Sequence, residues 1–375
     1  MAKTKILSIF GTRPEAVKMV PVVQALAAGA DKVDNLVCVT AQHRELLDEV
    51  LTPFNITPNY DLNLMRDRQT LTELTAAALV GIGEVIQQVQ PDWVLVHGDT
   101  ATTLAASLAA FYNKVKVGHV EAGLRSYDKY QPFPEEINRK VATAIADYHF
   151  APTQLAKEQL LKENIPQNSI FVTGNTGIDL IASTVKPNYS FFNEDIKSMI
   201  KPLETTSAKI ILMTAHRREN WGKPLENICK AVKKLAADFP DIIVVYPVHP
   251  NPVVQETVFS NLANCTNIIL TNPLNIFDMH NLMAKSYLVL TDSGGLQEEA
   301  PALNKPVIVL REVTERPEGA TAGTLLLAGT NPEKIYISVK NLLTNSETYQ
   351  QMSTAKNPFG DGKAAERIVK IILGI

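Results

Sequence analysis

The chain has 375 residues, of which 45% are hydrophobic and 20% are charged, and its formal net charge is −3. This length and composition predict two domains of ordinary size, each with a buried core. The small net charge excludes a general attraction for nucleic acid or for an anionic membrane surface. The cysteines Cys38, Cys229 and Cys265 share no metal-binding spacing and indicate a reduced, cytoplasmic location. No segment approaches transmembrane length, and the first residues predict a strand rather than a signal peptide.

In the first half of the chain, short apolar runs typical of buried strands alternate with segments typical of helices. Strands are predicted at residues 6–10, 35–40, 93–97, 115–120, 148–151 and 170–173. Helices are predicted after Pro14, after the polar segment 98–103, and at residues 44–51, 71–89 and 134–146. Because strands and helices alternate, we expect a parallel sheet with helices on both faces.

The alternation stops in the polar segment 186–209 and then resumes. Further strands are predicted at residues 210–214, 242–247, 268–270, 287–290 and 307–310, and an amphipathic helix at 364–373. The sequence therefore predicts an α/β protein with two doubly wound, Rossmann-like domains and parallel sheets. We expect the first domain at residues 1–173 and the second at 174–363, linked near 173–186. The C-terminal segment 364–375 is expected to pack back on the first domain.

Polar clusters follow the predicted strands in both halves of the chain, at residues 11–15, 98–103, 121–126, 216–220, 249–251 and 292–299. Ligands of parallel α/β sheets bind beyond the carboxyl ends of the strands. One polar cluster at a strand end is common, whereas this many together favour a functional site. We therefore expect the clusters to line one active site in the cleft between the two domains.

The segment 289–300 runs from a predicted strand through Ser293, Gly294 and Gly295 into a predicted helix. Adjacent glycines allow a ligand close to the backbone, and we expect unpaired N–H groups at the helix start to bind phosphate. Glu299 lies further along this helix, where its carboxylate could accept hydrogen bonds from a ribose diol. The pattern suggests a nucleoside diphosphate site. The alternative is an ordinary helix with an Asp or Ser N-cap.

Two basic residues follow the first strand. Arg13 lies between Thr12 and Pro14 in a tight turn, where a phosphate contact is the favoured interpretation. A hydrogen bond to a charged group contributes roughly 1.5–3 kcal/mol, so one arginine and a helix N-terminus could hold a diphosphate. Lys18 is either a second contact of this kind or a solvated charge on the helix.

Acid–base candidates also follow strands or begin helices. These residues are Asp99, Glu121, Glu135 and His216. Asp99 could instead cap the next helix, and Glu135 could simply favour a helix N-terminus through the dipole. The remaining histidines that we considered show no partner pattern and are expected to be structural: His43, His119, His149 and His280. No HxxH, HExxH or CxxC spacing occurs, so no metal site is expected.

Several of these clusters form longer motifs. They are FGTRPE at 10–15, AQHR at 41–44, HGDT at 97–100, HVEAGLR at 119–125, FPEEINR at 133–139, TGN at 173–175, HRREN at 216–220 and DSGGLQEE at 292–299. In this order they resemble the motifs of the non-hydrolysing UDP-N-acetylglucosamine 2-epimerases of bacteria. The resemblance covers essentially the whole chain, and the motifs together are highly specific.

The resemblance implies the two-domain GT-B architecture and the interconversion of UDP-GlcNAc and UDP-ManNAc without a cofactor. It further implies a homodimer that supplies ManNAc units for cell-surface polysaccharide. It implies acid–base roles for the four candidates above without dividing the roles among them. The substrate contacts that it implies, with uracil near Phe277, are Arg13, Lys18, Arg139, His216, Phe277, Ser293, Gly294, Gly295 and Glu299.

The chemistry of this reaction agrees with the residue types. The proton on C2 is not adjacent to a carbonyl, so breaking the C1–O bond first is needed to acidify it. UDP would leave, a 2-acetamidoglucal would form, and protonation from the other face followed by return of UDP would invert C2. The alternatives are a GT-B glycosyltransferase, which needs an acceptor groove, and a hydrolysing epimerase, which releases free ManNAc. A module that only binds nucleotide sugars would have no reason to place carboxylates near an anionic substrate.

Relatives in the resembled family can require UDP-GlcNAc at a second, allosteric site. The positions implied for that site are Gln42, Glu45, Arg68, Glu135, Arg217 and His249. Position 45 departs from the pattern, because some regulated relatives have glutamine there. An ionised glutamate can only accept hydrogen bonds, whereas glutamine can also donate. The alternative is that residues 42–51 form a solvated helix.

Overall fold

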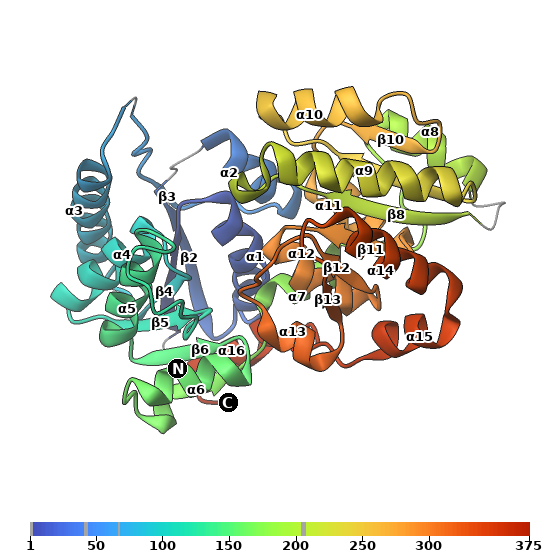
Figure 1. The fold of residues 1–375 in the computed structure, drawn as a ribbon. Coiled ribbons are helices and arrows are strands. Elements are labelled where there is room, and N and C mark those ends of the chain that lie inside the picture. Colours follow the sequence, from blue (N-terminus) through green and yellow to red (C-terminus); the bar gives the residue numbers. More distant parts are fainter. Residues whose placement is uncertain (1–2, 41–43, 67, 204–207) are drawn as a thin grey trace. The chain divides into compact units, whose positions relative to one another are not determined.

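The computed structural model describes residues 3–40, 44–66, 68–203 and 208–375. The chain forms two compact units, one made of residues 1–180 and 359–375 and the other of residues 181–358. Each unit contains its own sheet flanked by helices (Figure 1). This confirms the predicted fold class of two Rossmann-like α/β units.

The sheet of unit 1 has the strand order β3-β2-β1-β4-β5-β6-β7, and all neighbouring strands pair in parallel. The chain winds outward from β1 in one direction and then from β4 in the other. The loops after β1 and β4 therefore lie at the point where the winding reverses, which is where such sheets bind ligands. The strands are β1 (Thr4–Phe10), β2 (Val33–Val39), β3 (Tyr60–Asp61), β4 (Trp93–His97), β5 (Lys116–Val120), β6 (Tyr148–Ala151) and β7 (Ile170–Val172).

Helices cover both faces of this sheet (Figure 1). Side chains of a strand alternate between faces. Leu7 and Ile9 accordingly pack in one core cluster with Ala78 and Ile82 of α3 and with alanines of α4. The C-terminal helix α16 packs against α1. The helices are α1 (Arg13–Ala28), α2 (Arg44–Leu51), α3 (Leu71–Val89), α4 (Ala101–Tyr112), α5 (Glu135–Ile145), α6 (Gln154–Lys162) and α16 (Ala364–Leu373). Helix α7 (Thr176–Thr184) begins in unit 1 and ends in unit 2, because the boundary falls after Leu180.

The sheet of unit 2 repeats this plan with the order β10-β9-β8-β11-β12-β13, again all parallel. The winding reverses between β8 and β11. The strands are β8 (Lys209–Thr214), β9 (Ile242–Pro247), β10 (Ile268–Thr271), β11 (Leu288–Thr291), β12 (Val307–Val309) and β13 (Leu325–Leu327).

Two core clusters of unit 2 follow the alternation of β8. Ile211 and Met213 pack with residues of α9, α10 and α14, whereas Ile210 and Leu212 pack in a second cluster with residues of α8 and α11. Among the described residues, no helix combines the length and the apolar character that crossing a bilayer requires. The helices are α8 (Glu194–Leu203), α9 (Lys223–Asp238), α10 (Pro252–Leu262), α11 (Ile276–Lys285), α12 (Gly294–Glu299), α13 (Pro317–Ala322), α14 (Pro332–Thr344) and α15 (Ser346–Thr354).

Candidate active site

A buried carboxylate joins the loops that follow β1 and β4. Glu15 Oε2 accepts hydrogen bonds from the N–H groups of Gly11 (3.1 Å) and Thr12 (2.8 Å), and from the Thr12 hydroxyl (2.8 Å). Its Oε1 accepts bonds from the hydroxyls of Thr100 (2.7 Å) and Thr103 (3.4 Å). Burial raises the pKa of Glu15, and the hydrogen bonds act in the opposite direction. Glu15 therefore fixes the loops that carry two of the predicted site residues.

Glu121 directly follows β5 and has a left-handed backbone conformation, with φ at +62°. Its carboxylate pairs with the Lys18 ammonium, and the Nε2 atom of buried His97 lies 3.8 Å from Glu121 Oε2. Burial disfavours the ionised carboxylate, but Lys18 and His97 outweigh it and hold the pKa of Glu121 well below its ordinary value. Lys18 is thus part of an ion pair rather than a solvated charge.

Asp99 follows β4 and pairs with Arg139 of α5, so these two predicted residues lie together. Asn138 donates a hydrogen bond of 2.9 Å to the Asp99 carbonyl. Burial raises the pKa of Asp99, against the lowering effect of Arg139 and with a raising effect of Glu121. Asp99 does not make the N-cap hydrogen bond of α4, because the Thr100 hydroxyl makes it.

Glu135 begins α5, and its Oε2 is buried without a hydrogen-bond partner among the described residues. The neighbouring Glu136 has a different environment. It accepts hydrogen bonds from the N–H groups of Ser126 (3.0 Å) and Tyr127 (3.1 Å), which fixes the loop after β5. Of the two glutamates, Glu135 is therefore the one with an unused buried acceptor.

Arg13 is the first residue of α1 and is partly buried. Thr12 and Glu15 form a capping box around it, so the backbone at Arg13 is held at the start of the helix. Among the residues that the structure describes, none forms an ion pair with Arg13. This arrangement is consistent with a side chain that contacts an anion.

In unit 2, the loop after β11 leads into the short helix α12. The N–H of Ser293 donates to the Thr291 hydroxyl at 2.9 Å, so the expectation that this group is unpaired is wrong. The threonine side chain at the strand end supplies an acceptor that the motif alone did not suggest. The Glu299 carboxylate leans back along the helix, and its Oε1 would lie 3.6 Å from a Cβ added to Gly295.

Glu299 also has a neighbour that the sequence did not indicate. His280 of α11 is buried, with Nε2 3.5 Å from Glu299 Oε2 and Nδ1 2.7 Å from the Thr184 hydroxyl. These contacts give His280 polar partners, and its expected structural role stays a prediction. Phe277, the predicted uracil contact, lies three residues before His280 on the same helix.

Two guanidinium groups converge on Gly294 at the start of α12. The Nη2 atoms of Arg316 and Arg217 would lie 3.4 and 3.7 Å from a Cβ added to this glycine. Arg316 also pairs with Glu298 through an Nε–Oε1 contact of 2.6 Å. A Cβ at position 294 would touch both guanidinium groups at ordinary van der Waals distance. Arg316 was missed because it follows no predicted strand or recognisable motif.

His216 follows β8 and lies beside two polar residues of unit 2. Its ring stacks on His249, with centroids 5.5 Å apart and an interplanar angle of 7°. Its Nδ1 lies 3.2 Å from Oδ1 of Asp292, the residue after β11. Burial lowers the pKa of His249, and His216 adds to this effect. The structure thus brings together the loops after β8, β9 and β11.

Part of the predicted second site cannot be placed. Gln42 lies outside the described residues, as does His43, which was expected to be structural, and Glu45 lies in α2 without a described side chain. Arg68 is exposed and has a left-handed backbone with φ at +56°.

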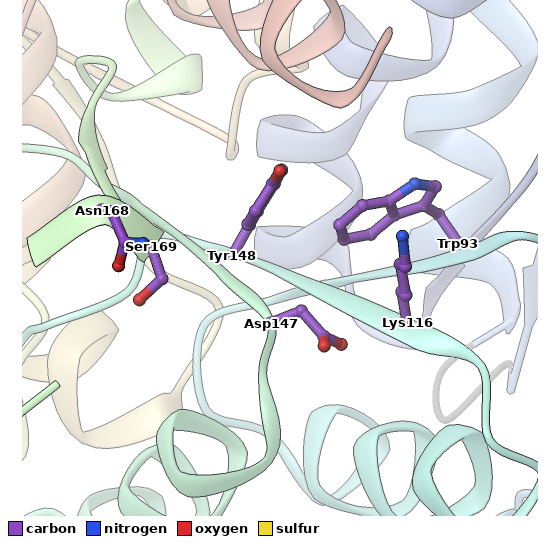
Figure 2. Close-up of a pocket in the computed structure, with 6 residues that line it drawn as sticks. All are labelled: Trp93, Lys116, Asp147, Tyr148, Asn168 and Ser169. Carbon is purple, nitrogen blue, oxygen red and sulfur yellow. The ribbon is translucent and has the colours of Figure 1, made fainter. Parts of the chain in front are cut away.

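A cavity of about 330 Å³ opens elsewhere in unit 1. Figure 2 shows its lining residues, which are Trp93, Lys116, Asp147, Tyr148, Asn168 and Ser169. They lie at the amino ends of β4, β5 and β6 and just before β7, whereas the candidate site residues follow the carboxyl ends. None of the lining residues is a predicted site residue. Among the described residues, no group of histidine, cysteine and carboxylate side chains could hold a metal ion.

Comparison with known proteins decides the family. A family model described as UDP-N-acetylglucosamine 2-epimerase matches residues 26–373. The chain belongs to the UDP-N-acetylglucosamine 2-epimerase family. The UDP-N-acetylglucosamine 2-epimerase of Bacillus subtilis (strain 168) is 54% identical over 373 residues, covering 100% of this chain and 96% of the relative.

Two solved structures of epimerases are also similar to this chain. The UDP-GlcNAc 2-epimerase of Neisseria meningitidis bound to UDP-GlcNAc has a TM-score of 0.87 and 44% identity, covering 99% of this chain and 100% of that one. The Methanocaldococcus jannaschii UDP-GlcNAc 2-epimerase in complex with UDP-GlcNAc and UDP has a TM-score of 0.79 and 36% identity, with the same coverage. These comparisons confirm the resemblance stated from the motifs, and this family member is an epimerase.

Proposed function

We propose that this epimerase interconverts UDP-GlcNAc and UDP-ManNAc by eliminating UDP to a 2-acetamidoglucal and adding UDP back after C2 is inverted. Family membership and the name of the Neisseria complex support the substrate class. The observation that carries the proposal is the pair of acidic residues after β4 and β5. Asp99 and Glu121 are both largely buried, and their surroundings shift their pKa values in opposite directions.

Opposite shifts of two carboxyl groups favour different chemical roles. Glu121, held ionised by Lys18, is suited to stabilise positive charge that develops at C1 as the C1–O bond breaks. Asp99, with its raised pKa, is suited to exchange a proton at C2. Glu135 has an unused buried acceptor and is the candidate for the second proton-transfer group. In each direction, the electron pair of the C1–O bond leaves with UDP and the C2 proton leaves to a carboxylate.

The nucleotide is proposed to bind unit 2. Arg217 and Arg316 near Gly294 supply positive charge, and Glu299 offers its carboxylate to the ribose. Phe277 remains the candidate for the uracil contact. Arg13 and the carboxylates of unit 1 are the candidates for contacts with the diphosphate and the reacting sugar ring.

Hydrogen exchange at C2 tests the elimination route. In D₂O, deuterium should appear at C2 of both UDP-sugars, and proton NMR should follow its incorporation. UDP-ManNAc that keeps the original C2 proton would contradict elimination through a glycal. The same spectra distinguish the alternatives, because a hydrolysing enzyme would release free ManNAc and a glycosyltransferase would leave C2 unchanged.

We also propose that UDP-GlcNAc activates the enzyme at a second site. The Methanocaldococcus enzyme forms a complex with UDP-GlcNAc and UDP, which supports this proposal. In this chain, the stacked His216 and His249 place a candidate residue of the second site beside a candidate of the first. UDP-ManNAc alone should then react only after a lag, which a trace of UDP-GlcNAc should remove. Immediate hyperbolic turnover of purified UDP-ManNAc would contradict activation.

The assembly and location of the enzyme extend this proposal. We propose a homodimer, since neighbouring helices α3, α4 and α5 expose large apolar side chains at Val80, Phe111 and Ile137. Analytical ultracentrifugation tests the dimer.

We propose a cytoplasmic enzyme that supplies ManNAc units for cell-surface polysaccharide. The free thiols of Cys38, Cys229 and Cys265 are consistent with this location.

A further inference from the structure

Asp292 is a fully buried carboxylate at the point where the winding of unit 2 reverses. One oxygen, Oδ2, accepts hydrogen bonds from the N–H groups of His216 (2.8 Å) and Arg217 (2.9 Å), and from the Asn220 amide (2.9 Å). All three donors belong to the segment after β8. The acceptor capacity of Oδ2 is therefore committed to this segment.

The other oxygen faces the imidazole of His216. Asp292 Oδ1 lies 3.2 Å from His216 Nδ1, and the contact is close but not well aligned. Within the described residues, Oδ1 accepts no other hydrogen bond. A buried acceptor without a donor is energetically unfavourable. A small rotation that aligns the imidazole N–H with Oδ1 is therefore favourable.

Two further contacts surround His216, one at its backbone and one at its ring. The Trp221 indole N–H donates to the His216 carbonyl at 3.2 Å, and His249 stacks on the ring face. The His216 side chain is 35% exposed, so its outer edge remains accessible. A proton on Nδ1 leaves Nε2 as the exposed nitrogen with a free electron pair.

We propose that Asp292 is a positioning residue that fixes His216 in the Nδ1–H tautomer and directs Nε2 toward the substrate. The proposal rests on the proposed function for the role of His216, but the tautomer can be measured without substrate. Asp292 itself is buried and acts only through the imidazole. In this way a residue that touches no ligand decides which nitrogen can exchange a proton or contact the leaving diphosphate.

The substitution Asp292→Asn tests this with little change in shape. The position of Oδ2 must still accept three hydrogen bonds, so the amide oxygen is expected there. The amide NH₂ group then takes the place of Oδ1 and can only donate. His216 Nδ1 must become the acceptor, and the proton must move to Nε2.

Nitrogen-15 NMR of protein labelled at histidine reads the tautomer directly, and His216→Gln identifies the signal among the seven histidines. We expect Nδ1–H in the native enzyme and Nε2–H in Asp292→Asn. Asn220→Ala removes one donor to the same carboxylate without reversing the polarity at Oδ1, so it should leave the tautomer unchanged. An unchanged tautomer in Asp292→Asn would overturn the proposal.

Kinetics provide the second measurement. The Nε2–H tautomer of His216 in Asp292→Asn should lower kcat by roughly 10²–10⁴-fold, with a smaller change in KM. In a His216→Gln background, Asp292→Asn should cause no further loss of kcat. An equal loss in both backgrounds would show a general structural role and overturn the proposal. If the native enzyme lacked epimerase activity, the proposed function would fail while the tautomer result would still stand.

Discussion

At the scale of single residues, Glu121 shows how this epimerase uses an unfavourable conformation. A non-glycine residue in the left-handed region costs on the order of 1–3 kcal/mol, and such residues cluster at functional sites. The position follows β5 directly, and its carboxylate contacts Lys18 from α1. Glycine would relieve the backbone but would remove the charge. The proposed role of the carboxylate in catalysis would account for a glutamate at this position.

The two groups of site residues should respond differently to substitution. Glu121→Gln should lower kcat by roughly 10²–10⁴-fold with little change in UDP affinity, because its carboxylate is proposed to act at the sugar ring. Asp99→Asn and Glu135→Gln should behave similarly. Ser293→Ala and Glu299→Ala should mainly weaken UDP binding.

Steady-state kinetics and calorimetric titration with UDP separate these effects. Glu73→Gln is a suitable control, since Glu73 forms a capping box with Thr70 on α3 and glutamine preserves that motif. An equal loss of UDP affinity in both groups would contradict the division.

Residue types at strand ends could be predicted from the sequence, but their partners could not. The motifs placed Asp99 and Glu121 after strands because apolar runs end just before them. The pairing of Asp99 with Arg139 depends on how α5 packs, and Lys18 reaches Glu121 from a distant segment. The contact of His280 with Glu299 likewise depends on α11. Such contacts require the fold.

At the scale of elements, strong sequence patterns predicted the boundaries of helices and strands accurately, whereas elements with weak patterns were missed. The amphipathic period of α3 and the apolar runs of β4, β6 and β9 predicted their observed limits. Strand β3 has only two residues and β13 only three, which is too short for a clear alternation. Helix α7 occupies much of the segment expected to link the domains, and α8 lies in the segment that interrupted the alternation.

Close packing at Gly11 should make the start of α1 intolerant of a side chain. A Cβ at this position would lie 2.0 Å from the Thr40 hydroxyl oxygen and 2.5 Å from that of Thr102. These hydroxyls share a hydrogen bond of 2.8 Å. Gly11→Ala should therefore destabilise the protein by about 1–3 kcal/mol through overpacking.

Urea unfolding measures this effect against a matched glycine. A Cβ at Gly83, inside α3, would meet no atom within 4 Å. Gly83→Ala should be neutral or stabilise by up to about 1 kcal/mol, because alanine favours the helix. Equal unfolding midpoints for the two variants would argue against close packing at Gly11.

At the scale of the whole molecule, each unit has its own core, but unit 1 is built from both ends of the chain. Helix α16 completes it, and the carboxylate of Asp179 accepts hydrogen bonds from the N–H groups of Ala364 (3.1 Å) and Ala365 (2.7 Å) at its start. The folded unit 1 therefore includes residues 359–375.

Neutral buried histidines should make unit 1 sensitive to acid. Burial lowers the pKa of His119 to about 3 and also lowers the pKa of His149. An unfolded histidine titrates near 6.5, so below this pH the unfolded state binds protons that the folded state excludes. For His119, the stabilisation is complete above about pH 6.5 and is lost as the pH falls toward 3, by about 1.4 kcal/mol per pH unit. His149 contributes in the same direction.

Urea unfolding at several pH values, followed by hydrogen exchange in unit 1, checks this slope. His119→Gln should weaken the dependence between about pH 6.5 and 4. Parallel curves for the native and substituted proteins would exclude His119 as a source of acid sensitivity.

In both units, a buried carboxylate joins the two loops where the sheet winding reverses: Glu15 in unit 1 and Asp292 in unit 2. This has a consequence for directed evolution. A library aimed at new sugar donors can vary the exposed residues of these loops, because hydrogen bonds to the buried carboxylates fix the loop backbones. Randomising Glu15 or Asp292 would instead disturb several positions at once. Libraries should therefore keep both carboxylates fixed and diversify around them.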